Sequence, residues 1–155
     1  KSVTVWTSHL VRSIQTSVPL GRPPRYWGAL NEIDAGICDG MTYTEIAREM
    51  PEDFAARKAD KLRYRYPQGE SYEDLIARLD PVIIELERQT DPVLIIGHQA
   101  VLRCIYGYLM ERSPGECPYL KIPLHTVVQL APKAYGCAEE RFYLGPEAQV
   151  PNAKS

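Results

Sequence analysis

The chain has 155 residues, of which 45% are hydrophobic and 25% charged, and this balance is ordinary for one globular domain with a single core. Its formal net charge of −2 offers no general attraction to nucleic acid or to a membrane surface. The longest apolar runs are far too short to cross a bilayer. These features exclude a basic nucleic-acid-binding domain and a membrane-spanning protein.

Cysteine and histidine usage narrows the chemistry. The four cysteines have no C-x-x-C or metal-type spacing, which favours free thiols and a cytoplasmic location. Only three histidines occur, and this small number argues against a His-rich metal site. The chain begins at Lys1 and enters a strand-like run at once, so we expect further residues upstream.

The first elements are a short strand and a helix. Residues 3–6 are rich in β-formers, and Thr7 or Ser8 can cap the helix that follows. Three apolar residues spaced four apart give this helix one apolar face: Leu10, Ile14 and Val18. Arg12 lies near the helix start, where it is either a solvated side chain or a cation at a strand-to-helix junction.

A loop over residues 19–27 leads to a predicted strand at 30–34, which ends before Gly36. Glu32 would then lie at a strand end, where an acid either lines a pocket or is solvated. Next, Thr42 and Glu45 match a capping box and predict a helix that reaches about Met50.

Pro51 begins another predicted helix, which holds Arg57 and Lys61 one turn apart on one face. Like charges at this spacing cost roughly 0.2–0.5 kcal/mol. An anion between the two cations would offset that repulsion. The alternative is a solvated basic face, which nearby Arg63 and Arg65 support.

The central stretch is residues 93–103 (VLIIGHQAVLR). Four apolar residues predict a buried parallel strand, Gly97 a sharp turn, and the residues after it a helix that ends near Arg112. His98 and Arg103 lie where ligands bind in open α/β sheets, beside helix N–H groups that suit a phosphate. The alternative is that His98 only caps a core strand.

The remaining elements complete an alternating pattern. Ser71 caps a helix with a buried stripe, residues 126–130 form a strand, and residues 141–144 form an edge strand. The stripe residues are Leu75, Leu79, Ile83 and Leu86. Strands alternating with helices predict a three-layer α/β fold with a mostly parallel sheet over residues 1–144, followed by a disordered tail over 145–155.

Three segments resemble motifs of the histidine phosphatases of the phosphoglycerate-mutase-like superfamily: residues 7–16 (TSHLVRSIQT), 30–36 (LNEIDAG) and 97–103 (GHQAVLR). Residues 63–72 (RYRYPQGESY) and 123–126 (PLHT) are similar to the fructose-2,6-bisphosphatase branch of that superfamily. This branch is joined to a kinase domain in one polypeptide. The resemblance therefore implies a kinase domain in the parent chain, a homodimer formed through the parent, and no cofactor or metal.

The resemblance also implies site roles. Arg12 would bind the transferring phosphoryl group, His98 would stabilise its transition state, and Glu32 would donate the proton to the leaving oxygen. Six further residues would hold the sugar and its other phosphate: Tyr43, Arg57, Lys61, Tyr72, Gln99 and Arg103. The expected reaction is hydrolysis of the 2-phosphate of fructose 2,6-bisphosphate through a phosphohistidine, in the control of glycolysis and gluconeogenesis.

One departure from the family pattern concerns the nucleophile. The family's nucleophilic histidine lies in an Arg-His-Gly motif on the first, central strand, and the sequence contains no such tripeptide. His9 and His125 match positions without assigned chemistry and are interpreted as structural. We therefore expect the first strand to be absent from this chain and the isolated chain to be inactive. Alternatives are another sugar-phosphate phosphatase, a phosphoglycerate mutase, or a non-catalytic phosphosugar-binding fragment.

Overall fold

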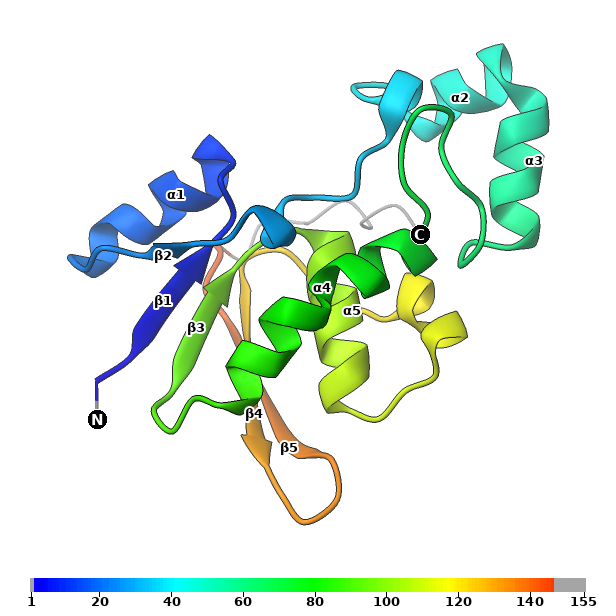
Figure 1. Ribbon diagram of the computed structural model, residues 1–155. Helices are drawn as coiled ribbons and strands as arrows, with labels where there is room; N and C mark the ends of the chain where they lie inside the picture. The colour runs from blue at the N-terminus through cyan, green and yellow to red at the C-terminus, as the bar shows by residue number, and fades with distance from the viewer. Residues whose placement is uncertain (1, 147–155) are drawn as a thin grey trace.

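A computed structural model describes residues 2–146 of the chain. Three parallel strands form one sheet in the order β2-β1-β3, and two further strands form the antiparallel hairpin β4-β5 (Figure 1). The strands are β1 (Thr4–Thr7), β2 (Arg25–Tyr26), β3 (Val93–Ile96), β4 (Thr126–Pro132) and β5 (Cys137–Tyr143). The expected α/β fold with a mostly parallel sheet is confirmed.

Five α-helices connect and cover these strands. They are α1 (Val11–Ser17), α2 (Tyr43–Glu49), α3 (Pro51–Ala59), α4 (Tyr72–Glu87) and α5 (Gln99–Leu109). Short 3₁₀ turns lie between them: η1 (Val18–Leu20), η2 (Gly28–Leu30), η3 (Gly36–Cys38) and η4 (Pro114–Tyr119). In Figure 1, α2 and α3 stand together away from the sheet, whereas α4 and α5 lie side by side next to it.

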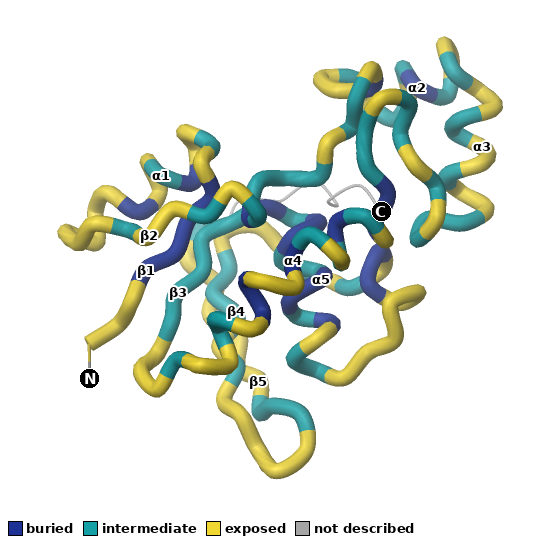
Figure 2. The backbone as a smooth tube through the Cα atoms, viewed as in Figure 1, coloured by how far each residue is buried: buried dark blue, intermediate teal, exposed yellow. Residues whose placement is uncertain are grey.

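The core lies between the sheet and the pair α4–α5. Trp6 of β1, Leu75 and Leu79 of α4, and Val101 of α5 are almost completely buried in one hydrophobic cluster. Figure 2 shows the same buried track along these elements, while α2 and α3 are mostly exposed or half-buried. Helices α2 and α3 thus lie at the periphery of the molecule rather than in its core.

The predicted helix starts at Thr42 and Ser71 are confirmed. In both cases the hydroxyl accepts the N3 backbone N–H, and the N3 carboxylate, Glu45 or Asp74, accepts the cap residue's own N–H. The buried stripe of α4 is confirmed for Leu75, Leu79 and Ile83, and Leu86 is half-buried.

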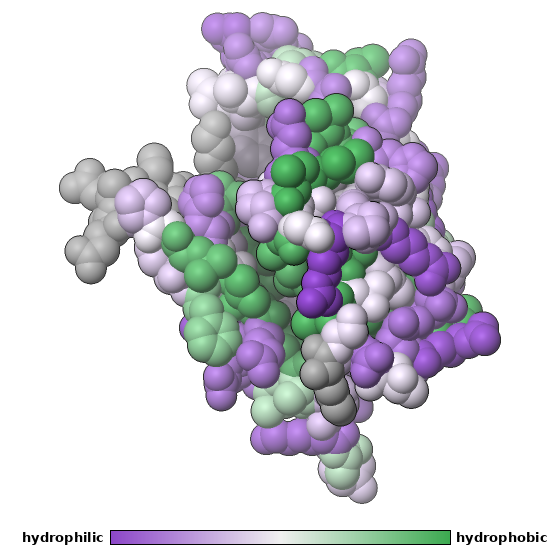
Figure 3. All heavy atoms as spheres, turned by 90° about the vertical axis from the view of Figure 1, so that its left-hand side faces the viewer, coloured by the Kyte–Doolittle hydropathy of each residue, from purple (hydrophilic) through white to green (hydrophobic). Residues whose placement is uncertain are grey.

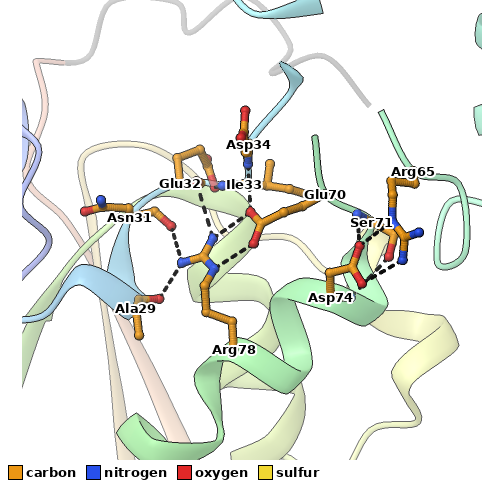
Figure 4. Close-up of polar contacts among 10 residues, drawn as sticks. All are labelled: Ala29, Asn31, Glu32, Ile33, Asp34, Arg65, Glu70, Ser71, Asp74 and Arg78. Carbon is orange, nitrogen blue, oxygen red and sulfur yellow. Dashed lines mark hydrogen bonds and ion pairs between the residues drawn. The ribbon is translucent and has the colours of Figure 1, made fainter. Parts of the chain in front are cut away.

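The strand predicted at 30–34 is wrong. Residues 28–30 form η2, and the next residues make no strand pairing because side chains bind their backbone instead. The Arg78 guanidinium donates to the carbonyls of Asn31 and Glu32, and Glu70 accepts the Asp34 amide (Figure 4). The β-strand of this region is β2, inside the segment predicted as a loop.

The N-cap and the buried face of α1 also differ from the prediction. Its N-cap is Leu10 with no side-chain cap, although the Ser8 hydroxyl accepts the Leu10 N–H at 3.1 Å. The buried residues of α1 are Ser13 and Ser17, while Val18 is 68% exposed. Small hydroxyl residues therefore let α1 approach the sheet closely. Helix α5 also ends earlier than predicted, at Leu109.

The sheet edges bear apolar surface. Val11, Val18, Leu20 and Tyr26 are exposed around α1 and β2, and Figure 3, which turns that side toward the viewer, shows apolar patches between polar ones. Among residues 2–146, β3 pairs only with β1, and β4 pairs only with β5. The expectation that the family's first, central strand is absent from this chain stays a prediction.

Candidate phosphate-binding site

The site begins at the junction between β3 and α5, where His98 is the N-cap residue of α5. His98 is buried, and its Nε2 lies 2.8 Å from the Ser8 hydroxyl, which in turn lies 2.7 Å from the Ser13 hydroxyl. Because β1 and β3 are adjacent parallel strands, the residues that follow them meet at the same edge of the sheet. The Ser8 hydroxyl, which is itself held by the Ser13 hydroxyl, thus fixes the orientation of the His98 ring.

Glu32 faces the same helix start. Its Oε2 accepts the Ala100 N–H at 3.4 Å, in the first turn of α5, and its Oε1 accepts the Ile33 N–H at 2.9 Å. These two bonds fix the Glu32 carboxylate at the first turn of α5. The structure therefore brings together His98 and Glu32, two residues far apart in sequence.

Burial, together with the nearby Arg12 guanidinium, lowers the pKa of His98 to about 4. The imidazole is therefore neutral at pH 7. A neutral imidazole can donate one N–H to a bound anion without carrying a charge of its own. Arg12 is exposed on α1 and supplies the positive charge of this half of the site.

Arg57, Lys61 and Arg103 form a second group, here named the cation cluster. Burial and the positive charges of Arg57 and Arg103 lower the pKa of Lys61. Within residues 2–146, none of the three forms an ion pair. The cluster is therefore an unneutralised concentration of positive charge, which fits an anion.

Tyrosines surround the cation cluster. Arg57 donates to the Tyr43 hydroxyl at 3.1 Å and stacks over its ring, Arg103 donates to the Tyr72 hydroxyl at 3.3 Å, and the Lys61 ammonium lies over the Tyr119 ring. Burial raises the pKa of Tyr72 to about 12, so its hydroxyl keeps its proton. These rings hold the cations in place without neutralising them.

An open pocket of about 320 Å³ lies beside these groups and is lined by residues that include Glu32, Tyr43 and Tyr66. Burial raises the pKa of Tyr66, and the positive charge of nearby Arg57 offsets part of that rise. The pocket therefore extends from Glu32 to Tyr43, the residue whose ring Arg57 stacks over.

The arrangement differs from the sequence prediction in detail. Lys61 lies beyond the end of α3 at Ala59, so the two cations do not share one helical face, yet they still converge. Gln99 begins α5 and is half-buried, with no side-chain hydrogen bond to another described residue. The sequence reasoning missed Tyr119 and the bond between Ser8 and His98, because only the chain's fold brings those residues to the site.

Within the described part of the chain, no three His, Cys, Asp or Glu side chains gather as a metal-binding group. The same residues contain no helix long and apolar enough to cross a membrane.

Comparison with known proteins supplies the family. Residues 1–144 match the histidine phosphatase superfamily (branch 1). The chain belongs to this superfamily. Among solved structures, two bacterial phosphatases share its fold. The α-ribazole phosphatase of Shigella flexneri superposes with a TM-score of 0.78 at 18% identity, covering 94% of this chain and 76% of that one. A mycobacterial glucosyl-3-phosphoglycerate phosphatase gives a TM-score of 0.76 at 22% identity, covering 92% and 76%.

Curated relatives are much closer in sequence. The chain is 60% identical over 147 residues to 6-phosphofructo-2-kinase/fructose-2,6-bisphosphatase 1 of Rattus norvegicus, covering 95% of this chain and 31% of that protein. It is 55% identical over 148 residues to isoform 4 of Homo sapiens, covering 96% and 31%. The chain thus spans about a third of the length of these bifunctional histidine phosphatases.

Proposed function

We propose that this chain is the substrate-binding part of a fructose-2,6-bisphosphatase, and that it takes part in hydrolysis of the 2-phosphate to give fructose 6-phosphate and phosphate. The observation that carries the proposal is the presence of two separate positive regions, Arg12 beside His98 and the cation cluster. Two such regions suit a sugar that carries two phosphates.

The proposal assigns a chemical role to each site residue. The cation cluster holds the 6-phosphate, and Tyr43 and Tyr72 present hydroxyls to the ligand. Arg12 balances the charge on the 2-phosphoryl oxygens, and neutral His98 donates a hydrogen bond to them. Gln99 offers its amide to the sugar at the start of α5.

Glu32 acts on protons. As the bond between phosphorus and the C2 oxygen breaks, Glu32 gives its proton to that oxygen, and phosphorus bonds to a histidine nitrogen. Glu32 then takes a proton from the water that attacks phosphorus, and the histidine leaves with its electron pair. In the family pattern the nucleophilic histidine lies in the Arg-His-Gly tripeptide, which this 155-residue sequence does not contain.

We also propose the setting of the parent protein. The names of the relatives join a kinase to the phosphatase, so the parent of this chain would carry a kinase domain. It would form a homodimer and act in the cytoplasm on the fructose 2,6-bisphosphate that controls glycolysis.

Calorimetric titration with fructose 2,6-bisphosphate tests the proposal. Arg57→Ala and Lys61→Ala should each weaken binding roughly tenfold, because each removes one charge-assisted contact to a phosphate. Lys58→Ala, at an exposed lysine of α3, is the matched control and should stay within about twofold. Tighter binding of 3-phosphoglycerate than of fructose 2,6-bisphosphate would instead favour a mutase-like site.

Turnover is tested separately. The 155-residue chain should bind fructose 2,6-bisphosphate labelled at the 2-phosphate without releasing phosphate and without acid-labile protein-bound label. Label on the protein would show that a histidine within this chain serves as nucleophile.

A further inference from the structure

Arg78 lies outside the set of residues that would touch the substrate, and its hydrogen bonds converge on the segment that carries Glu32. Its Nη1 donates to the carbonyls of Ala29 at 2.7 Å and Asn31 at 2.9 Å, and its Nη2 donates to the Glu32 carbonyl at 3.4 Å (Figure 4). These three bonds hold the backbone on both sides of residue 31.

The same guanidinium is fixed by Glu70. Arg78 Nε and Nη2 donate to the two carboxylate oxygens at 2.8 and 2.9 Å, a bidentate geometry, and both side chains are less than a quarter exposed. Glu70 also accepts the Asp34 amide at 2.9 Å, and its own amide donates to the Asp34 carbonyl at 2.8 Å. We name this arrangement, Arg78 with Glu70 and the backbone of residues 29–34, the Arg78 clamp.

The clamp matters because residues 31–35 have no regular structure of their own. A carboxylate on such a segment has no strand or helix to hold it. Yet Glu32 Oε2 lies 3.4 Å from the amide nitrogen of Ala100, which belongs to the core helix α5. Something must fix the segment relative to α5, and Arg78 comes from α4, which packs against α5.

We propose that Arg78 is a positioning residue, which sets the place of the Glu32 carboxylate at the start of α5 through the backbone of residues 29–34. The proposal deepens the proposed function, since it rests on the role given there to Glu32 as the proton donor. Only a planar fork with five N–H donors can serve Glu70 and three carbonyls together, so lysine should not replace it.

The test is nuclear magnetic resonance of the 155-residue chain, because the Ala100 amide reports the ionisation of its acceptor. In the unsubstituted 155-residue chain the Ala100 amide shift should change with pH, and Glu32→Gln should abolish that change. Arg78→Lys keeps the charge but not the fork, and it should reduce the amplitude of the Ala100 change by more than half. Arg88→Lys, on an exposed arginine just after α4, should leave the amplitude unchanged.

Two further measurements keep the proposal falsifiable. Glu70→Gln retains the shape of the clamp but loses its ion pair, and it should give an intermediate amplitude if Arg78→Lys fails to fold. Affinity for fructose 6-phosphate should change less than threefold in both variants, because the cation cluster is untouched. An unaltered Ala100 titration in folded Arg78→Lys would overturn the proposal, whereas failure of every variant to bind phosphosugar would overturn only the proposed function.

Discussion

The Arg78 clamp and the cation cluster place arginines in opposite surroundings. Arg78 has a carboxylate partner and three carbonyl acceptors, so each of its nitrogens is satisfied within the protein. Arg57, Lys61 and Arg103 have tyrosine rings, hydroxyls and one carbonyl around them but no described carboxylate. A satisfied arginine stabilises the fold, whereas clustered cations without a counter-ion cost stability until an anion binds.

The largest loss of stability is expected from a substitution that forces apart the two segments joined by the Arg78 clamp, which contain Asp34 and Glu70. A Cβ on Gly69 would lie 2.3 Å from the Asp34 carbonyl oxygen and 2.7 Å from the Gly36 amide nitrogen, and these backbone atoms cannot give way. Gly69→Ala should therefore lower the free energy of unfolding by about 4 kcal/mol, above the usual cost of an added methyl group. Urea denaturation measures it, with Gly28→Ala, at a glycine with open space around it, as the control. Equal losses in both variants would contradict the close contact.

Acid should destabilise the other half of the candidate site, where Arg12 lies near His98, because that half resists another positive charge. The pKa of His98 lies near 4 in the folded chain, below its ordinary value of 6.5. Above pH 6.5 neither state is protonated at this group. As pH falls from 6.5 toward 4, only the unfolded chain takes up the proton, so stability should drop by about 3 kcal/mol.

Urea denaturation of His98→Gln at several pH values measures this term. The variant should lose that part of the pH dependence, whereas His9→Gln, at an exposed histidine, should keep it. A wild-type slope in His98→Gln would show that other groups cause the acid sensitivity.

The smallest expected change in stability has opposite signs in the cation cluster and in the Arg78 clamp. Lys61→Met removes one of three repelling charges and should stabilise the unliganded chain by roughly 0.5 kcal/mol in low salt. Arg78→Met should destabilise it, because it leaves Glu70 and three carbonyls without their donor. Thermal unfolding with and without 0.5 M NaCl checks both signs. A lower melting temperature for Lys61→Met would show that Lys61 is a structural residue.

Local signals in the sequence predicted much of this fold. A hydroxyl followed three residues later by an acid marked the starts of α2 and α4, and an apolar run before Gly97 marked β3. His98 could be placed at the site because the position after a parallel strand is fixed by topology. For the two helix starts, the deciding contacts lie within three residues of one another.

The errors occur where distant residues decide the local structure. Residues 30–34 alternate like a strand, but Arg78, more than forty residues later, binds their carbonyls. The convergence of Lys61 with Arg103 and Tyr119 depends on how the chain turns after α3. Spacing along one helix predicted that Arg57 and Lys61 lie close together. They do converge, but α3 ends before Lys61, so the reason was wrong.

The two tryptophans give this fold an optical consequence. Trp6 and Trp27 are the only tryptophans in the sequence, their ring centroids lie 5.2 Å apart, and the Arg25 guanidinium lies over both. Trp27 immediately precedes η2 and the residues held by Arg78. Intrinsic fluorescence of this chain therefore reports from one place, the entry to the segment that carries Glu32, and needs no added label.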